Sequence, residues 1–145
     1  MLKVLVVDDS LFMRKHLEIM LVELKYEVVG LAKDGHQALA AYDILKPDIV
    51  LMDVDIPDMN GIEVLSILKE KDQSVKIVIL TAQHDSDIIK FALKAGAENY
   101  LFKPPTFTKL NDAIRKILPK ENISKTKVIL ESEPLNENFY KLEDL

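Results

Sequence analysis

The fold can be inferred from residues 47–61, which read Pro47-Asp48-Ile49-Val50-Leu51-Met52-Asp53-Val54-Asp55-Ile56-Pro57-Asp58-Met59-Asn60-Gly61. Four consecutive apolar residues, Ile49 to Met52, are typical of a strand covered on both faces, and such strands occur in parallel sheets between helices. Asp53 follows this strand directly, and a loop containing Pro and Gly separates it from a helical pattern that starts near Ile62. The sequence therefore places a carboxylate at the carboxyl end of a buried parallel strand, where open α/β sheets bind ligands.

Short apolar runs alternate with longer helical patterns through the first 118 residues. The expected strands are 4–7, 27–31, 49–52, 76–80 and 99–102. The expected helices are about 11–24, 37–45, 62–71, 86–94 and 106–118. Five such units with short connections predict an α/β fold, a doubly wound five-stranded parallel sheet with five flanking helices. The first, third and fourth strands are uniformly apolar and should be central, which gives the strand order 2-1-3-4-5.

The composition is that of a globular chain without the marks of a nucleic-acid-binding, secreted or membrane protein. The chain has 145 residues, of which 48% are hydrophobic and 30% charged, enough for one domain with a substantial core. A net charge of −5 argues against nucleic-acid binding, which needs a basic face. The chain has no Cys, no signal-peptide pattern, and no apolar run near the roughly 18 residues of a membrane span. We therefore expect a cytoplasmic protein that binds neither nucleic acid nor membrane.

Polar side chains follow four of the five predicted strands. Asp8 and Asp9 come after the first strand, Asp53 after the third, Thr81 after the fourth and Lys103 after the fifth. Because the carboxyl ends of parallel strands meet at one edge of a sheet, we expect these side chains to lie close together. This convergence is the strongest functional signal in the sequence.

The charges of these side chains predict a cation site. Two carboxylates about 5 Å apart repel each other by roughly 3 kcal/mol at an effective dielectric constant of about 20, so three of them need compensation. Lys103 supplies only one positive charge, and a donor set of oxygens favours Mg²⁺, with Mn²⁺ or Ca²⁺ as substitutes. Asp53 could then attack a phosphoryl group while the metal and Lys103 neutralise its oxygens and Thr81 donates a hydrogen bond.

Four motifs in this order resemble the receiver domain of two-component response regulators. They are Val6-Val7-Asp8-Asp9-Ser10, Met52-Asp53-Val54-Asp55-Ile56-Pro57-Asp58-Met59-Asn60-Gly61, Leu80-Thr81-Ala82 and Tyr100-Leu101-Phe102-Lys103-Pro104. The resemblance implies a flavodoxin-like fold and a receiver domain at residues 1–118, and it leaves 119–145 as a C-terminal tail or linker. Within the family, Asp9-Ser10-Leu11-Phe12-Met13-Arg14 is most similar to the chemotaxis-type (CheY-like) single-domain regulators.

The resemblance also implies roles for individual residues in a signalling switch. Asp53 would accept a phosphoryl group from the phosphohistidine of a histidine kinase. Mg²⁺ would be held by Asp9 and Asp53 directly, by Asp8 largely through water, and by the backbone carbonyl of Asp55. The Lys103-Pro104 bond would be cis, which would place the Lys103 ammonium group over the site. Such a protein is not an enzyme in the usual sense, because it catalyses only its own phosphorylation and dephosphorylation.

Thr81 and Tyr100 match the family's switch pair. Phosphorylation would draw the Thr81 hydroxyl toward the phosphoryl group and swing the Tyr100 ring inward, which would remodel the face formed by the fourth helix, fifth strand and fifth helix. A downstream target protein or a second copy of the chain would dock there. Tyr100 could alternatively be an edge-strand aromatic that only packs under the fourth helix.

Some positions depart from the family pattern or have simpler explanations. Asp55 and Gln83 flank the path of an attacking water, so we expect them to set the rate of dephosphorylation, in a direction that the sequence leaves open. We interpret the side chains of Asp55 and Asp58 as loop acids rather than metal ligands. Pro105 stands where the family more often has Phe, and Phe107 could fill that space. The three histidines are scattered and are best explained as surface residues.

Two other functions stay open at the level of sequence. The chain could be the receiver part of a longer transcriptional or methylesterase regulator. Alternatively, Asp53-Val54-Asp55 resembles the Asp-x-Asp motif of haloacid-dehalogenase-type phosphatases, although that motif usually follows the first strand and the chain lacks room for a cap. The segment after Pro119 is either a flexible tail or an amphipathic piece that docks on the receiver's signalling face or on a second subunit.

Overall fold

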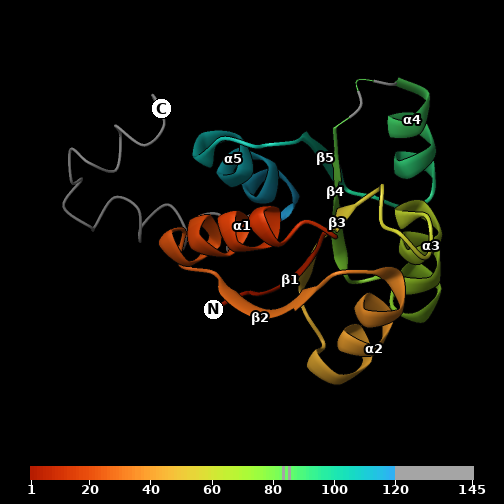
Figure 1. The fold of residues 1–145 in the computed structure, drawn as a ribbon, viewed down its shortest axis with the longest axis horizontal. Coiled ribbons are helices and arrows are strands. Elements are labelled where there is room, and N and C mark those ends of the chain that lie inside the picture. The colour runs from red at the N-terminus through yellow and green to blue at the C-terminus, as the bar shows by residue number, and fades with distance from the viewer. Residues whose placement is uncertain (83, 85, 120–145) are drawn as a thin grey trace.

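A computed structural model describes residues 1–82, 84 and 86–119, and it shows a sheet with helices on both faces (Figure 1). The described strands are β1 (Lys3–Val7), β2 (Glu27–Ala32), β3 (Ile49–Asp53), β4 (Lys76–Thr81) and β5 (Asn99–Phe102). The described helices are α1 (Leu11–Glu23), α2 (Gly35–Leu45), α3 (Gly61–Lys71), α4 (Ser86–Lys94) and α5 (Phe107–Ile117). Gln83 and the predicted tail beyond Pro119 lie outside the described residues.

The sheet is parallel throughout, and its strand order is β2-β1-β3-β4-β5, as predicted. β3 lies in the middle, where Val4 of β1 pairs with Ile49 and Leu80 of β4 pairs with Asp53. All five residues of β3 are buried, which explains why its sequence is a continuous apolar run up to the terminal aspartate.

The helices lie on both faces of the sheet (Figure 1), and a layer of hydrophobic side chains holds them on each face. Helices α1 and α5 pack on one face, against side chains such as Val4, Leu51 and Leu80. Helices α2, α3 and α4 cover the other face, against the alternate side chains of the same strands. No helix in the described part of the chain is both long enough and apolar enough to span a membrane.

Side-chain caps set where the helices begin. Ser10 accepts a hydrogen bond from the Met13 N–H and so starts α1, as the sequence indicated. Helix α2 begins two residues before the predicted Gln37, because Asp34 accepts from the Gln37 N–H and ends the preceding loop early. Thr106 caps α5 in the same way, and the buried Phe107 packs into the core beneath it.

Gly61 brings the loop after β3 back over the end of the strand. Its N–H donates to the carbonyl of Val54, and a Cβ atom at this position would lie only 2.2 Å from the carbonyl oxygen of Asp53. No side chain larger than hydrogen fits so close to the backbone. The loop that leaves Asp53 therefore depends on a glycine at the start of α3.

Candidate functional site

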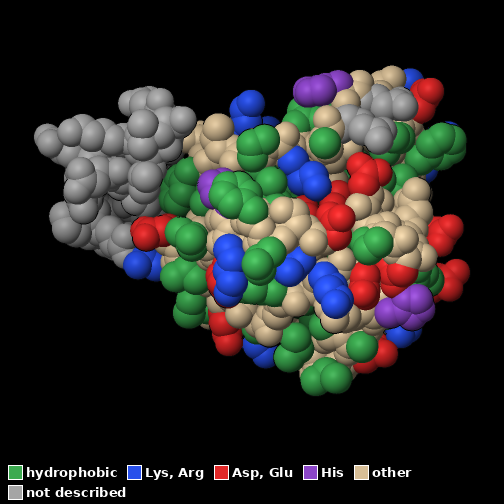
Figure 2. Space-filling model, viewed as in Figure 1, with side chains coloured by type: hydrophobic (Ala, Val, Ile, Leu, Met, Phe, Trp, Pro, Cys, Tyr) green, Lys and Arg blue, Asp and Glu red, His purple; other side chains and the backbone are tan. Residues whose placement is uncertain are grey.

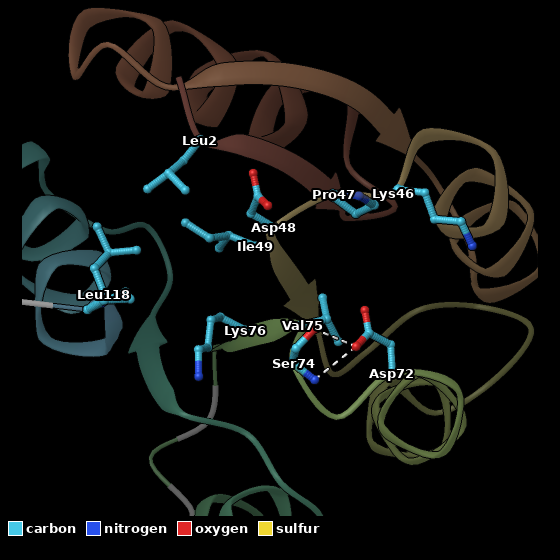
Figure 3. A pocket seen from close by; sticks show the side chains of 11 residues that line it. Leu2, Lys46, Pro47, Asp48, Ile49, Asp72, Ser74, Val75, Lys76 and Leu118 are labelled. Carbon is cyan, nitrogen blue, oxygen red and sulfur yellow. Dashed lines mark hydrogen bonds between the residues drawn. The ribbon is translucent and has the colours of Figure 1, made fainter. Parts of the chain in front are cut away.

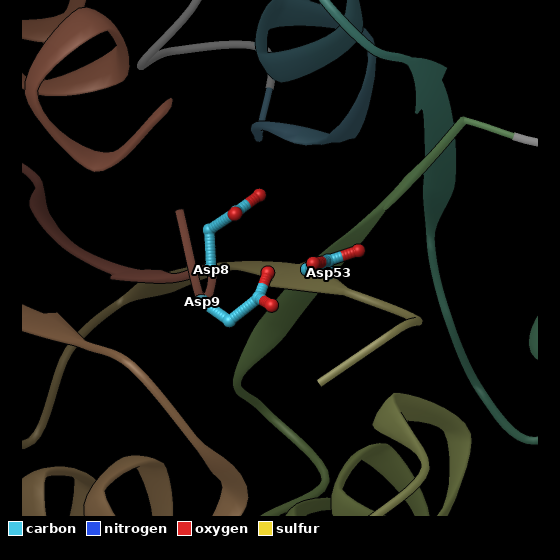
Figure 4. A group of neighbouring side chains, drawn as sticks. All are labelled: Asp8, Asp9 and Asp53. Carbon is cyan, nitrogen blue, oxygen red and sulfur yellow. The ribbon is translucent and has the colours of Figure 1, made fainter. Parts of the chain in front are cut away.

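Three carboxylates meet at the carboxyl ends of the two central strands (Figure 4). Asp8 and Asp9 follow β1, and Asp53 ends β3. Each can offer one oxygen to a set whose members all lie within 4.8 Å of one another. Asp8 and Asp53 are fully buried, whereas Asp9 is exposed to solvent. The predicted convergence of these three residues is therefore present in the fold.

Lys103 joins the cluster from the loop after β5. Its Nζ atom lies 3.1 Å from Oδ2 of Asp8 and 3.1 Å from Oδ1 of Asp53. The Lys103-Pro104 peptide bond is cis, as the resemblance implied. One ammonium group thus bridges two buried carboxylates that are 45 residues apart in the chain (Asp8 and Asp53).

Asp53 is the most electrostatically perturbed carboxylate of the cluster. Burial raises its pKa, and the nearby charge of Asp8 raises it further. The Asp55 N–H, which donates to Oδ1 at 3.1 Å, and the Lys103 ammonium act in the opposite direction without cancelling the rise. The other oxygen, Oδ2, is buried and has no hydrogen-bond partner among the described residues.

Lys103 stays charged in this environment. Burial by itself would lower the pKa of its ammonium group, but the carboxylates of Asp53 and Asp8 outweigh burial and raise it. One positive charge against three carboxylates leaves the cluster negative. The ligand atoms it offers are all oxygens, and no group in the described part of the chain binds Oδ2 of Asp53, so the cluster fits a hard divalent cation such as Mg²⁺.

The loop between β1 and α1 holds Asp8 in place. The Ser10 N–H donates to Oδ1 of Asp8 at 2.9 Å, and the Asp8 N–H donates to the carbonyl of Ala32 at 3.0 Å. The Arg14 guanidinium donates to the carbonyl of Asp8 at 2.7 Å. Sequence reasoning missed Arg14, because its contact depends on how the first turn of α1 folds back over the end of β1.

Thr81 and Tyr100 lie on neighbouring strands but in different surroundings. Thr81 ends β4 next to the cluster and is fully buried, and it pairs in register with Phe102 of β5. Tyr100 is 38% exposed, and its ring meets Phe102 edge-on at 5.7 Å between centroids. The His84 ring packs on the same Phe102 ring, at 4.1 Å. Phe102 thus links the loop after β4 to Tyr100.

The two loop acids after β3 differ in their contacts. The Asp55 side chain is exposed and does not belong to the carboxylate cluster. Asp58 accepts from the N–H groups of Gly35 and His36 and contacts the His36 ring, so it ties the β3–α3 loop to the start of α2. Partial burial would raise the pKa of Asp58, but these donors hold it well below its usual range. No pattern in the sequence indicates this long-range contact.

The opposite edge of the sheet carries a pocket of about 260 Å³ (Figure 3). Its lining mixes apolar and charged residues: Leu2, Lys46, Pro47, Asp48, Ile49, Asp72, Ser74, Val75, Lys76, Leu118 and Pro119. Asp72 is already engaged there, because it accepts from the Ser74 side chain and from the Tyr42 hydroxyl at 2.5 Å. The carboxyl edge, with its partnerless carboxylate oxygen, is therefore the better candidate for chemistry.

Comparison with known proteins agrees with this placement. Residues 4–115 match the family model described as the response regulator receiver domain. The chemotaxis protein CheY of Thermotoga maritima is 37% identical over 115 residues, which cover 79% of this chain and 96% of that protein. The transcriptional regulatory protein PdtaR of Mycobacterium tuberculosis is 40% identical over 112 residues, or 77% of this chain and 54% of PdtaR.

The fold has close structural neighbours as well. One is a crystal structure of a complex of CheX, CheY, BeF3 and Mg from Borrelia burgdorferi. It matches this chain with a TM-score of 0.78 and 29% identity, covering 82% of this chain and 90% of the matched one.

Proposed function

This chain belongs to the response regulator receiver domain family, and from that membership we propose that Asp53 accepts a phosphoryl group from a histidine kinase. The observation that supports the assignment is the state of Asp53 itself. It is buried at the end of the central strand, beside Lys103 and two further carboxylates, with one oxygen that no described group binds. A buried oxygen without a donor is available as a nucleophile.

The proposed reaction is a direct transfer. An oxygen of Asp53 forms a bond to phosphorus while the P–N bond to the kinase's imidazole breaks, and the imidazole nitrogen keeps the electron pair. The raised pKa of Asp53 reflects a carboxylate that is poorly solvated, and this makes it a better nucleophile than an exposed aspartate. Lys103, already 3.1 Å from Oδ1, can follow the negative charge onto the phosphoryl oxygens.

The residues that would hold Mg²⁺ are Asp9 and Asp53 directly, Asp8 largely through water, and the backbone carbonyl of Asp55. When bound, the cation neutralises charge on the phosphoryl oxygens and lowers the repulsion between them and the carboxylates. The backbone of Asp55 is held close to the site by its N–H bond to Asp53, whereas its side chain points to solvent. Mn²⁺ is the expected substitute for Mg²⁺.

We further propose that Thr81 and Tyr100 transmit the phosphorylation of Asp53 to the surface of the protein. The buried Thr81 lies at the end of β4, which is the neighbour of the strand that ends at Asp53. Tyr100 lies on β5, on the other side of β4, and is exposed at the surface. Receivers of this type bind histidine kinases and downstream targets and act as signalling switches. The α4–β5–α5 face, which carries the exposed Tyr100, is our candidate for the target surface or for a dimer contact.

The rate of dephosphorylation should depend on Asp55 and Gln83. The exposed Asp55 side chain is free to reach the edge of the site, and Gln83 comes two residues after Thr81 at the end of β4. The direction of their effect stays open, and the cytoplasmic location expected from the sequence stays a prediction.

The biological setting we propose is chemotaxis, because of the CheY relatives and their length. The match with the Thermotoga CheY spans 96% of that protein, which is the proportion expected of a receiver that works alone. The match with PdtaR covers 54% of its length, so the alternative of a receiver within a longer regulator stays open. In either setting we propose a receiver at residues 1–118 and a tail or linker at 119–145.

Intact mass spectrometry tests the proposal. The chain is incubated with acetyl phosphate, with and without Mg²⁺, as wild type, as Asp53→Asn and as Asp48→Asn. Asp48 precedes the same strand at its other end and is exposed, so it is a matched control. We expect one added phosphoryl group in wild type and Asp48→Asn, only with Mg²⁺, and none in Asp53→Asn. An adduct that persists in Asp53→Asn would refute the assignment.

A further inference from the structure

The loop between β3 and α3, residues 54–60, contacts a second helix before α3 begins. Near its start the Asp55 N–H donates to Oδ1 of Asp53 at 3.1 Å, which keeps the backbone of Asp55 beside the carboxylate cluster. Asp58 lies three residues further along the chain and does not belong to that cluster. Its carboxylate contacts the start of α2 instead, so one short loop joins the cluster to a helix on the face of the sheet.

The Asp58 carboxylate accepts hydrogen bonds from the first two N–H groups of α2. Oδ1 accepts from the Gly35 N–H at 2.7 Å, and Oδ2 accepts from the His36 N–H at 3.0 Å and also contacts the His36 ring. Asp34 accepts from the next N–H, that of Gln37, at 2.8 Å. Figure 2 shows acidic side chains beside a histidine at the surface where α2 begins. The N–H groups at a helix start need acceptors and favour negative charge, so α2 is capped by two acids from different loops.

The residue next to Asp58 packs on the same end of α2. A Cβ atom at Gly35 would lie 2.9 Å from Sδ of Met59 and 3.1 Å from its Cβ and Cγ atoms. Met59 is partly buried and packs against the hydrophobic layer on this face of the sheet. The loop therefore rests directly on the backbone of α2, through a contact that is independent of the Asp58 hydrogen bonds.

The chain between Asp55 and Asp58 has little freedom to absorb a movement. Ile56 is buried in the same hydrophobic layer, and the ring of Pro57 restricts the backbone. A shift of Asp58 would therefore be passed on to the backbone of Asp55. In the part of the chain that the structure describes, α2 supplies no ligand atom to the carboxylate cluster, so its influence on the site acts through the loop.

We propose that Asp58 is a positioning residue for the cation: it holds the β3–α3 loop on the start of α2, fixes the backbone carbonyl of Asp55 and so tightens Mg²⁺ binding. This role rests on the proposed function, in which that carbonyl is a ligand. Residues that orient metal ligands without touching the metal typically change its affinity by about 10–100-fold when they are replaced. A residue that only capped α2 would stabilise the fold and leave the affinity for Mg²⁺ unchanged.

Two alanine variants of the full chain separate positioning from capping. Asp58→Ala removes the contact between the loop and α2, and Asp34→Ala removes the other acid at the same helix end, with the same change in charge. We expect Asp58→Ala to weaken Mg²⁺ binding about tenfold and Asp34→Ala to stay within about twofold of wild type. Both should lower the urea midpoint of unfolding, because both remove a helix cap. Calorimetric titration with Mg²⁺ gives the dissociation constants.

The metal-free chain supplies a second measurement. The Asp55 N–H should exchange with solvent several-fold faster in Asp58→Ala than in wild type, because its bond to Asp53 depends on the position of the loop. Asp34→Ala should leave this exchange rate unchanged. Asp58→Asn keeps one acceptor oxygen, so both its Mg²⁺ affinity and its exchange rate should fall between those of wild type and Asp58→Ala.

The possible failures can be told apart. Equal Mg²⁺ affinity in Asp58→Ala and wild type would overturn the positioning role and leave the cation site intact. An equal loss of affinity in Asp58→Ala and Asp34→Ala would assign the effect to charge or to the stability of α2, and would also overturn it. A wild-type chain that binds no Mg²⁺ would exclude the cation site itself, and with it the role of Asp58.

Discussion

At the scale of single residues, the account rests on the unfavourable position of Asp53. Its carboxylate is fully buried, lies near a second buried carboxylate and has one oxygen without a hydrogen-bond partner among the described residues. The Lys103 ammonium group offsets part of the unfavourable burial of this negative charge, but the pKa of Asp53 remains above its ordinary value. The site thus keeps a poorly solvated charge that the fold alone does not need, as is common where chemistry occurs.

Replacing that carboxylate by an amide should stabilise the metal-free protein at neutral pH. A carboxyl group whose pKa is raised by folding destabilises the folded state when ionised, so Asp53→Asn should melt a few degrees above wild type. The difference should be full above the folded pKa and should vanish as the pH falls through it toward the ordinary value of 3.8. Thermal melts from pH 7 to pH 4 measure this, with Asp48→Asn as the control. A difference that grows on acidification would contradict it.

Removing the ammonium group should slow the reaction more than it harms the fold. In Lys103→Gln, no ammonium group accompanies the charge that moves onto the phosphoryl oxygens, so the phosphorylation rate with acetyl phosphate and Mg²⁺ should fall by about 100-fold. Lys33 is exposed at the same edge of the sheet, after β2, and Lys33→Gln should keep the wild-type rate. The rates follow from the time course of the mass adduct. Equal rates in both variants would show that Lys103 has no part in the transfer.

At the scale of elements, the sequence predicted the strands and the carboxylate cluster at their carboxyl ends better than the loops. The runs 49–52 and 77–80 are apolar because both of their faces are buried, so their pattern alone identified central strands. From that order the positions of Asp8, Asp53 and Lys103 followed directly. The early start of α2 could not be predicted in this way, because the helix begins at the cap residue Asp34 and its apolar pattern begins only later.

Contacts that join distant loops could not be read from the sequence. Asp58 caps α2 across 23 residues, and Arg14 reaches back to the carbonyl of Asp8. Both look like ordinary surface charges until the loops are placed in space. The exposure of Tyr100 could not be read from the sequence either, since the side chain of an aromatic residue on an edge strand can be buried or exposed.

The loop after β3 should fail when Gly61 gains a side chain. In Gly61→Ala the Cβ atom would fall 2.2 Å from the Asp53 carbonyl oxygen, and the backbone must move. We expect a loss of about 2–3 kcal/mol of stability together with much slower phosphorylation, because the loop carries Asp55. Gly30→Ala is the control, since its Cβ would meet no backbone atom and only the ends of the Leu45 and Leu5 side chains. Unfolding by urea measures both, and an unperturbed Gly61→Ala would contradict the close approach.

At the scale of the whole molecule, the cation site should link metal binding to folding. The three carboxylates come from β1 and β3 and face one another only in the folded chain, so Mg²⁺ should bind the folded state alone. At 100 times its dissociation constant, Mg²⁺ should therefore add about 2.7 kcal/mol of stability. Melting curves across a Mg²⁺ titration measure this. Asp9→Asn should need more Mg²⁺ for the same shift, and a shift that is identical in Asp9→Asn would exclude Asp9 as a ligand.

The most direct test of the account is to locate the phosphoryl group itself. The chain is treated with acetyl phosphate and Mg²⁺ and then with borohydride, which reduces an aspartyl phosphate to homoserine, and the peptides are sequenced by mass spectrometry. We predict homoserine at position 53 and at no other aspartate, Asp8 and Asp9 included. Homoserine at a different position, or an intact Asp53 in a chain that has gained a phosphoryl group, would contradict the central assignment.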